Sequence, residues 1–399
     1  MKAGWEIKPL AEVCDIVNGS TPLRSNKAYW ENGSINWFTI EDIREQGRKI
    51  ASTNQKITHH ALEKTSIRIL PSKSVLLCCT ASIGEYAITE APMATNQQFN
   101  GLVVKNHQTL KPLFLFYFCA TLKDKLAELS GKTTIDFIPI SRLRNILIPT
   151  PPILEQQRIV TILDEAFEGI ATATANAKKN LANARELFES CLQSVFTTQG
   201  EGWVEKRLKE LCEKITDGTH QTPTYYDDGV IFLSSRNVKA RTIDWENIKY
   251  IDTKQHLEMH KRVAPRINDI LLAKNGTTGV AAIVDRDVTF NIYVSLALLR
   301  ALDVILPNLL LYFINSSVAK KQFNSRLKGS GVPNLHLEEI REVTISFPKS
   351  IAEQQSIVAK FDELCAETKK LEAIYQQKLT ALEELKKSIL NQAFSGQLS

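Results

Sequence analysis

The chain has 399 residues, of which 43% are hydrophobic and 23% are charged, and its formal net charge is +5. This composition is that of a folded protein and excludes extensive disorder, while the length exceeds what one hydrophobic core usually holds, so we expect two or three domains. Because no stretch approaches ~18 uninterrupted apolar residues and the first residues form no apolar signal region, the sequence argues against membrane spanning and secretion.

The first segment, residues 1–150, predicts a mixed α/β domain. Short apolar runs bounded by Gly, Pro or Asn, such as Ser74–Leu77 and Leu102–Val104, indicate strands. A helix is expected from Lys111 to Leu129, because a proline at its first turn suits a helix start. A glycine-containing loop at Ser130–Thr134 and a short strand that ends at Pro149 follow.

Residues 151–199 predict a long spacer helix. Apolar or small side chains recur at steps of four and three from Ile159 to Val195, which is the pattern of a coiled-coil seam. Two successive steps of four, from Ala173 through Ala177 to Leu181, form a stutter. Such a helix is roughly 70 Å long at ~1.5 Å per residue.

The second half repeats the first. Ile351–Val358 opens a second long helix 198 residues after Ile153–Val160 opens the first, and strands and a proline-initiated helix (Pro307 to Leu327) recur in residues 200–350. The helix in 351–399 carries a stutter at the matching place, Leu371 to Leu379. We therefore predict an α+β fold with two homologous mixed α/β domains separated by two long helices, which pair as an antiparallel coiled coil about a pseudo-twofold axis with the domains at opposite ends.

The positive charge belongs to the globular segments. Residues 1–150 carry 18 basic against 13 acidic side chains and residues 200–350 carry 21 against 18, whereas both helical segments are slightly acidic. This distribution is expected of domains that face a polyanion such as DNA.

No catalytic or metal-binding constellation stands out in the sequence. Pro149–Ile153 lacks the amide and the aromatic ring of an adenine methyltransferase loop, and there is no P-loop or H-E-x-x-H motif. Asp228 followed by Asp252-Thr253-Lys254 has only the outline of a nuclease metal site. Seven cysteines, an odd number without a C-x-x-C pair, favour a reduced, cytoplasmic location. We expect a protein that is not an enzyme and has no cofactor or metal of its own.

What remains are loops rich in the donors that contact phosphates and base edges. The candidate DNA contacts are Arg24, Asn26, Lys27, Arg44, Lys132, Thr133, Thr134, Arg236, Asn237, Lys274, Asn275, Thr277, Lys328, Ser330 and Asn334. The helix starts lie at the junction of domain and helix, which suits architecture or subunit docking, with helix capping as the alternative. The docking candidates are Glu155, Gln156, Gln157, Glu353, Gln354 and Gln355.

Taken together, the chain resembles the specificity (S, HsdS) subunit of type I restriction-modification systems. The residues that carry the resemblance are Pro151–Gln157 and Pro348–Gln355, Thr80–Gly84 and Gly276–Gly279, Thr95–Phe99, and the loops that contain Gly131 and Gly329. The resemblance covers essentially the whole chain.

That resemblance implies a non-catalytic subunit with two target-recognition domains, each of which reads one half of a bipartite asymmetric site in double-stranded DNA. Its helices would set the gap and dock two methyltransferase (M) subunits that methylate adenine N6 with S-adenosylmethionine, and restriction (R) subunits that use ATP and Mg would join them. Two alternatives stay open: a bifunctional chain in which one repeat contains a nuclease or methyltransferase centre, and a coiled-coil adaptor that does not bind DNA.

Overall fold

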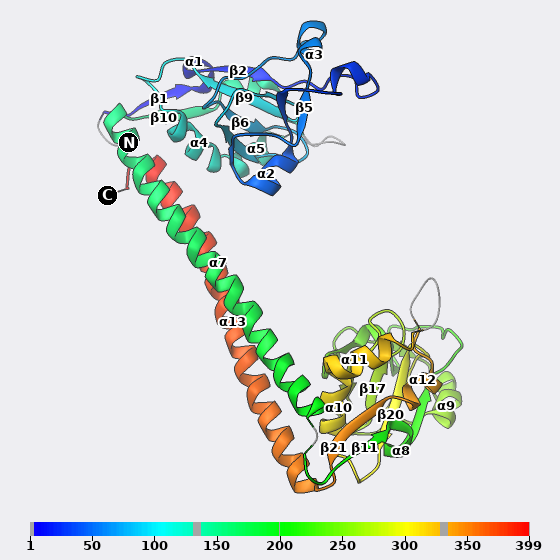
Figure 1. The fold of residues 1–399 in the computed structure, drawn as a ribbon. Coiled ribbons are helices and arrows are strands. Elements are labelled where there is room, and N and C mark those ends of the chain that lie inside the picture. The colour runs from blue at the N-terminus through cyan, green and yellow to red at the C-terminus, as the bar shows by residue number, and fades with distance from the viewer. Residues whose placement is uncertain (1–3, 131–136, 199, 328–333, 399) are drawn as a thin grey trace. The chain divides into compact units, whose positions relative to one another are not determined.

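Two long helices run through the chain, α7 (Ile153–Thr197) and α13 (Ile351–Ser395), each of 45 residues. We describe the fold from a computed structural model, in which residues 4–130, 137–198, 200–327 and 334–398 are described. The chain divides into two units, residues 1–177 with 377–399 and residues 178–376. Each unit therefore contains one globular domain and half of each long helix. The chain can be followed through both units by the colours of the ribbon in Figure 1.

The first unit is built from three sheets. An antiparallel pair joins β1 (Glu6–Pro9) to β10 (Leu147–Thr150). The central sheet has the order β2 (Cys14–Asn18), β9 (Phe99–Val104), β6 (Val75–Cys78), β7 (Tyr86–Thr89) and β4 (Lys49–Ile50). The third sheet has the order β5 (Gln55–Ile57), β3 (Ile35–Phe38) and β8 (Ala94–Thr95). Its shorter helices are α1 (Leu10–Val13), η1 (Lys27–Tyr29), α2 (Ile40–Gln46), α3 (His59–Lys64), α4 (Pro112–Ala120), α5 (Lys123–Leu129) and α6 (Ile140–Arg144).

The second unit repeats this plan. An antiparallel pair joins β11 (Trp203–Arg207) to β21 (Thr344–Pro348), and the central sheet has the order β12 (Cys212–Asp217), β20 (Leu296–Ala301), β17 (Ile270–Ala273) and β18 (Ala281–Ile283). A third sheet has the order β16 (Lys249–Ile251), β13 (Val230–Leu233) and β19 (Phe290–Ile292). A hairpin is formed by β14 (Val238–Lys239) and β15 (Thr242–Ile243). Its shorter helices are α8 (Leu208–Leu211), η2 (Ser235–Asn237), α9 (Thr253–Arg262), α10 (Pro307–Asn315), α11 (Ser317–Asn324) and α12 (Leu337–Arg341).

One close backbone approach appears in both units directly after the first strand of the central sheet. A Cβ atom built on Gly19 would lie 1.9 Å from the carbonyl oxygen of Asn96, and one on Gly218 would lie 1.9 Å from that of Ile292. Only glycine fits such a position. The loops that leave β2 and β12 therefore start from the same fixed point in each domain.

Each proline-initiated helix is shorter than the sequence suggests. A single helix was expected from Lys111 to Leu129 and another from Pro307 to Leu327, but both are broken into two, α4 with α5 and α10 with α11. In the second unit the reason is Ser316, whose backbone is extended and whose Oγ accepts a hydrogen bond from the Ala319 N–H, so it caps a new helix.

The long helices pair antiparallel within each unit. In the first, Arg158 Nη2 donates to the Leu398 carbonyl and Lys386 lies over the ring of Phe167; in the second, Arg185 pairs with Glu372 and the ring of Phe196 packs on that of Phe361. Early residues of α7 thus meet late residues of α13, and late residues meet early ones. This arrangement, with the mixed α/β domains, confirms the predicted fold class.

The helix pair and the globular domain of each unit share one core. Buried side chains of α7 and α13 join the core cluster of the central sheet in both units, through Leu163 and Leu390 in the first and Leu192 and Phe361 in the second. At the stutter Ala177 of α7 is 1% exposed, whereas Leu371 of α13 is 38% exposed. The domains are therefore packed onto the helices rather than attached by a flexible linker.

Candidate nucleic-acid interface

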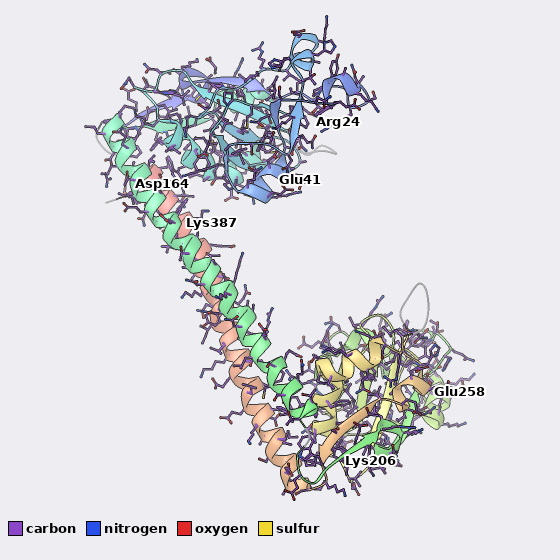
Figure 2. The ribbon with its side chains drawn as sticks, in the orientation of Figure 1. Arg24, Glu41, Asp164, Lys206, Glu258 and Lys387 are labelled. Atoms are coloured by element: carbon purple, nitrogen blue, oxygen red, sulfur yellow. The ribbon has the colours of Figure 1, made fainter. Side chains whose placement is uncertain are left out.

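The predicted contact residues of the first unit begin in the loop that leaves β2. Arg24 is exposed on this loop, where Figure 2 labels it, and its guanidinium carbon lies 4.0 Å from the ring centroid of Trp30 and 4.7 Å from that of Trp37. The same guanidinium donates to Gln55 Oε1 at 2.6 Å. Stacking on two indoles holds the arginine in one orientation while leaving its edge open to a ligand.

Two tryptophan side chains fix the base of this loop. Trp30 Nε1 donates to the Leu23 carbonyl at 3.2 Å and Trp37 Nε1 donates to the Ser20 carbonyl at 3.1 Å, while the two rings pack edge to face. Trp37 is 1% exposed, so the platform under Arg24 is continuous with the core. The loop conformation is therefore set by aromatic packing, not by the loop backbone alone.

The other described candidates of the first unit are less constrained. Asn26 Oδ1 accepts from the Ala28 N–H and caps η1, Lys27 is exposed and pairs with Glu31, and Arg44 is exposed and pairs with Glu41. Surface ion pairs of this kind are weak, so these two basic side chains can exchange an acidic neighbour for a phosphate.

In the second unit the neighbouring candidates Arg236 and Asn237 differ in exposure. Arg236 is exposed on η2. Asn237 is 6% exposed, its Oδ1 accepts from the Ser234 N–H at 3.0 Å, and its Nδ2 donates to the Asp244 and Asn247 carbonyls. All its polar atoms are used internally, as those of a capping residue are. We correct the contact set accordingly and remove Asn237 from it.

Lys274 also lies inside the protein. Its side chain is 7% exposed and its Nζ donates to Asp217 Oδ2 at 2.7 Å. Burial would raise the pKa of Asp217, but the hydrogen bond and charge of Lys274, with further bonds from Arg262 and His220, lower it below its ordinary value. Lys274 is therefore the buried partner of a carboxylate, and we remove it from the contact set as well.

The turn after Lys274 lies at the surface. Thr277 is exposed, and Asn275 forms an isolated antiparallel bridge with Asn334. The Oδ1 atoms of both asparagines are buried and have no partner among the described residues. The five remaining predicted contacts lie outside the described residues: Lys132, Thr133, Thr134, Lys328 and Ser330.

The helix starts contain a matched pair of buried glutamines. Gln156 is 0% exposed, its Oε1 accepts from the Lys111 N–H at 2.9 Å, and its Nε2 donates to the Thr109 and Pro151 carbonyls. Gln354, also 0% exposed, repeats all three bonds with Leu306, Val304 and Pro348. These amides bind the start of each long helix to the loop before α4 or α10. Because this uses their polar atoms internally, we correct the docking set by removing both glutamines.

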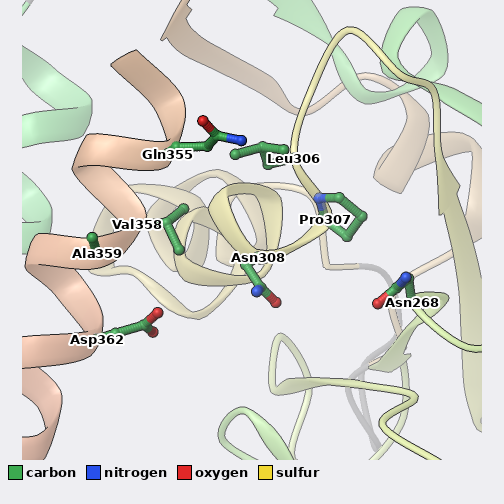
Figure 3. A pocket seen from close by; sticks show the side chains of 8 residues that line it. All are labelled: Asn268, Leu306, Pro307, Asn308, Gln355, Val358, Ala359 and Asp362. Carbon is green, nitrogen blue, oxygen red and sulfur yellow. The ribbon is translucent and has the colours of Figure 1, made fainter. Parts of the chain in front are cut away.

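The neighbouring residues of each glutamine stay near the surface. Glu155 pairs with Arg158, Glu353 Oε1 accepts from Trp203 Nε1 at 3.0 Å, and both Gln157 and Gln355 are exposed. In the second unit Gln355 borders a pocket of about 300 Å³ between α13 and the start of α10. Figure 3 shows Gln355, Val358 and Asp362 along one side of α13, opposite Leu306–Asn308.

A tyrosine also joins each domain to its helix. Tyr117 Oη donates to Asp164 Oδ1 and Tyr312 Oη donates to Asp362 Oδ1, both at 2.6 Å. Burial, followed by the bond to the carboxylate, raises the pKa of both phenols. The junction of domain and helix thus carries the same polar contacts twice.

The residues with the outline of a nuclease site have structural roles. Asp252 Oδ1 accepts from the Gln255 N–H at 2.7 Å and caps α9, and Asp228 Oδ1 accepts from the Gly229 N–H. Within the described ranges, no group of three or more His, Cys, Asp or Glu side chains could hold a metal ion. None of the helices in that part of the chain combines the length and apolar character that crossing a membrane requires.

Sequence reasoning missed one polar cluster, made of Asp217, His220, Arg262 and Lys274. Arg262 Nη2 donates to Asp217 Oδ1 at 2.7 Å, and His220 Nε2 lies 3.3 Å from that oxygen. A lysine directly after the apolar strand Ile270–Ala273 was the available signal, because such a position is usually buried. Its partner Asp217 lies 57 residues away in the sequence and meets it only in the fold.

Comparison with known proteins agrees with this arrangement. A family model described as the type I restriction modification DNA specificity domain matches residues 2–183 and again residues 200–381. The specificity subunit of the type I restriction enzyme MjaIX from Methanocaldococcus jannaschii is 25% identical over 99% of this chain and 93% of its own length. The EcoprrI specificity subunit from Escherichia coli is 30% identical over 53% of this chain and 55% of its own length.

Solved structures share the fold. A chain from a study of complex assembly and conformational transition of the type I R-M system superposes with a TM-score of 0.82 at 21% identity and covers 100% of this chain and 99% of its own. The HsdS subunit from Thermoanaerobacter tengcongensis gives 0.61 at 20% identity, over 100% and 98%. With its two matched segments and the duplicated framework described above, the chain belongs to the family of type I restriction-modification DNA specificity subunits.

Proposed function

We propose that each globular domain reads one half of a bipartite, asymmetric DNA site and that the paired helices set the gap between the halves. The observation that supports this most directly is that both domains share the same framework contacts. These include the close backbone approach at the glycine after the first strand and the hydrogen bonds of the glutamine at the helix start. The side chains that this framework presents differ between the domains. A shared scaffold with different reading groups suits two independent half-sites.

The chain itself supplies specificity, and its partners supply catalysis. Two methyltransferase subunits would dock at the helix starts, through Glu155, Gln157, Glu353 and Gln355, and methylate adenine N6 with S-adenosylmethionine. Restriction subunits that use ATP and Mg would join this core. The two-fold repetition of the helix starts supports a pair of identical partners.

An exchange of domains tests the proposal. Residues 200–350 are replaced by the equivalent domain of a relative, and the complex with its methyltransferase partner is expressed in a host whose modified sites are then sequenced. One half-site should change while the other half-site and the gap stay the same. A change in both half-sites, or methylation by the chain alone, contradicts the proposal.

A further inference from the structure

The end of the central sheet in the second unit carries a charged cluster that the proposed function does not yet use. Asp217 closes β12 and Lys274 follows β17, and their side chains are 4% and 7% exposed. Arg262, at the end of α9, and His220 are 52% and 60% exposed. Two buried members thus support two members at the surface, and Arg262 lies on the helix that carries Glu258 in Figure 2.

We propose that Arg262, held by Asp217, reads a guanine in the second half-site. This inference rests on the proposed function and names a specificity-determining residue for it. Asp217 and Lys274 position the arginine and do not touch DNA.

The contacts of Arg262 fix one side of its guanidinium. Nη2 donates to Asp217 Oδ1 at 2.7 Å, Nε lies 3.4 Å from the Asp217 carbonyl, and Nη2 also lies 3.3 Å from His220 Nε2. Among the described residues, Nη1 has no hydrogen-bond partner. When His220 Nε2 carries the proton and donates it to Asp217 Oδ1, the second N–H of Nη2 is free beside those of Nη1. This open edge offers two donors to the two acceptors, O6 and N7, that guanine presents in the major groove.

The buried ion pair leaves the positive charge of Arg262 unbalanced within the cluster. Lys274 neutralises the carboxylate at Oδ2, so the cluster as a whole carries a net charge of about +1 when His220 is neutral. A phosphate would bring a full negative charge beside Asp217, whereas a base edge brings only partial charges. Because the net charge of the cluster is about +1, charge alone permits either ligand, and the two parallel donors of the open edge are what match a guanine.

The cluster also lies beside the residues already assigned to the interface. The backbone of Lys274 leads directly into the surface turn of Asn275 to Thr277, and its carbonyl accepts from the Leu335 N–H at 3.0 Å. His220 lies in the loop that leaves β12 after Gly218, which matches the Arg24 loop of the first unit.

The first unit has different chemistry at the equivalent places. Gly19 follows Asn18 as Gly218 follows Asp217, and Cys79 makes the backbone bond to Gln98 that Lys274 makes to Ser295. An amide and a thiol replace the ion pair, and burial raises the pKa of Cys79 to about 11, so it is uncharged at neutral pH. Guanine reading by this device therefore belongs to the second domain.

The test uses the complete chain in complex with its methyltransferase partner. Modified sites are mapped by sequencing, and affinity is measured for duplexes in which each base pair of the second half-site is replaced in turn. Arg262→Ala should reduce discrimination at one guanine from at least about tenfold to within about twofold, because the bidentate contact is lost. The first half-site should stay unchanged, and Arg266→Ala is the control for loss of one exposed arginine from the same domain.

Two further variants separate base reading from charge and from folding. Arg262→Lys keeps the charge and should preserve the salt dependence of binding but lose the discrimination. The double variant Asp217→Asn/Lys274→Cys introduces the residue types that the first unit has at these places, those of Asn18 and Cys79. It should weaken discrimination between bases although Arg262 is present. Uniform weakening across all sequences, with a shallower salt dependence for Arg262→Ala, would identify a phosphate contact and overturn the inference.

The outcome for the unsubstituted complex separates this inference from the proposed function. If that complex shows no two-part site, the proposed function fails and the inference fails with it. If the two-part site is present and Arg262→Ala leaves every position of it unchanged, only the inference is contradicted.

Discussion

The two globular domains differ in side-chain chemistry at the end of the central sheet, beside backbone contacts that both of them share. In the first domain Arg24 stacks on two tryptophan rings, and the end of the central sheet carries the uncharged side chains of Asn18 and Cys79. In the second domain Arg262 is instead held by the buried pair of Asp217 and Lys274. One arginine is oriented by aromatic faces and the other by a carboxylate. Under the proposed function, these are two ways to orient a reading group on one scaffold.

The scaffold contacts explain this freedom. The glycine approach, the glutamine at the helix start and the tyrosine–aspartate bond recur with nearly equal distances in both units. None of these contacts involves an exposed loop side chain. Changes in the loops therefore leave the framework intact, whereas a change in the framework should damage either domain to a similar extent.

The largest expected effect comes from the paired glycines. Gly19→Ala and Gly218→Ala should each lower the free energy of unfolding by roughly 3 kcal/mol or more, because the added Cβ overlaps a backbone oxygen. Gly169→Ala is the control, since its Cβ meets nothing within 4 Å on α7 and should raise stability by about 0.5–1 kcal/mol. Denaturant unfolding measures all three. A large loss at only one of the paired glycines would show that the frameworks are not equivalent.

The buried glutamines should have the next largest effect. Gln156→Ala or Gln354→Ala leaves one N–H and two carbonyls without their partner, which costs about 2–3 kcal/mol of unfolding free energy. Gln157→Ala and Gln355→Ala, at exposed neighbours, should change stability by less than about 0.5 kcal/mol and should instead weaken co-purification with the methyltransferase subunit. Unchanged co-purification in the exposed variants would remove them from the docking surface.

A smaller and local effect is expected at Arg24. Arg24→Ala removes the stacked guanidinium and its bond to Gln55, and affinity for the first half-site should fall about tenfold while the second half-site stays the same. Competition with duplexes altered in one half-site at a time measures this. Equal losses for both half-sites would mean that the domains do not read independently.

The smallest expected change concerns spacing alone. Four residues inserted near Ala177 add ~6 Å of helix, close to two base pairs at ~3.4 Å each, and coiled coils absorb such an insertion as a stutter. Methylome sequencing should show a gap longer by about one or two base pairs with both half-sites retained. An unchanged gap would show that the helices do not set the spacing between the half-sites.

Sequence alone determined the features that depend on periodicity. Hydrophobic spacing in Ile159–Val195 and its repeat predicted both long helices, and the 198-residue offset predicted two domains of the same fold. The family resemblance drawn from the helix starts and glycine turns is confirmed by the matches to residues 2–183 and 200–381. These predictions succeed because local patterns and internal repeats are visible without knowing which distant residues meet.

Tertiary structure alone decided which polar side chains are free. Asn237, Lys274, Gln156 and Gln354 have the residue types of ligand-binding groups, yet each is buried by partners distant in sequence or by its own cap. Arg262 is held by Asp217, which lies 45 residues away in the sequence. A polar side chain that is buried is usually paired, because burial without a partner costs free energy, and burial follows from long-range packing that residue type and spacing do not encode.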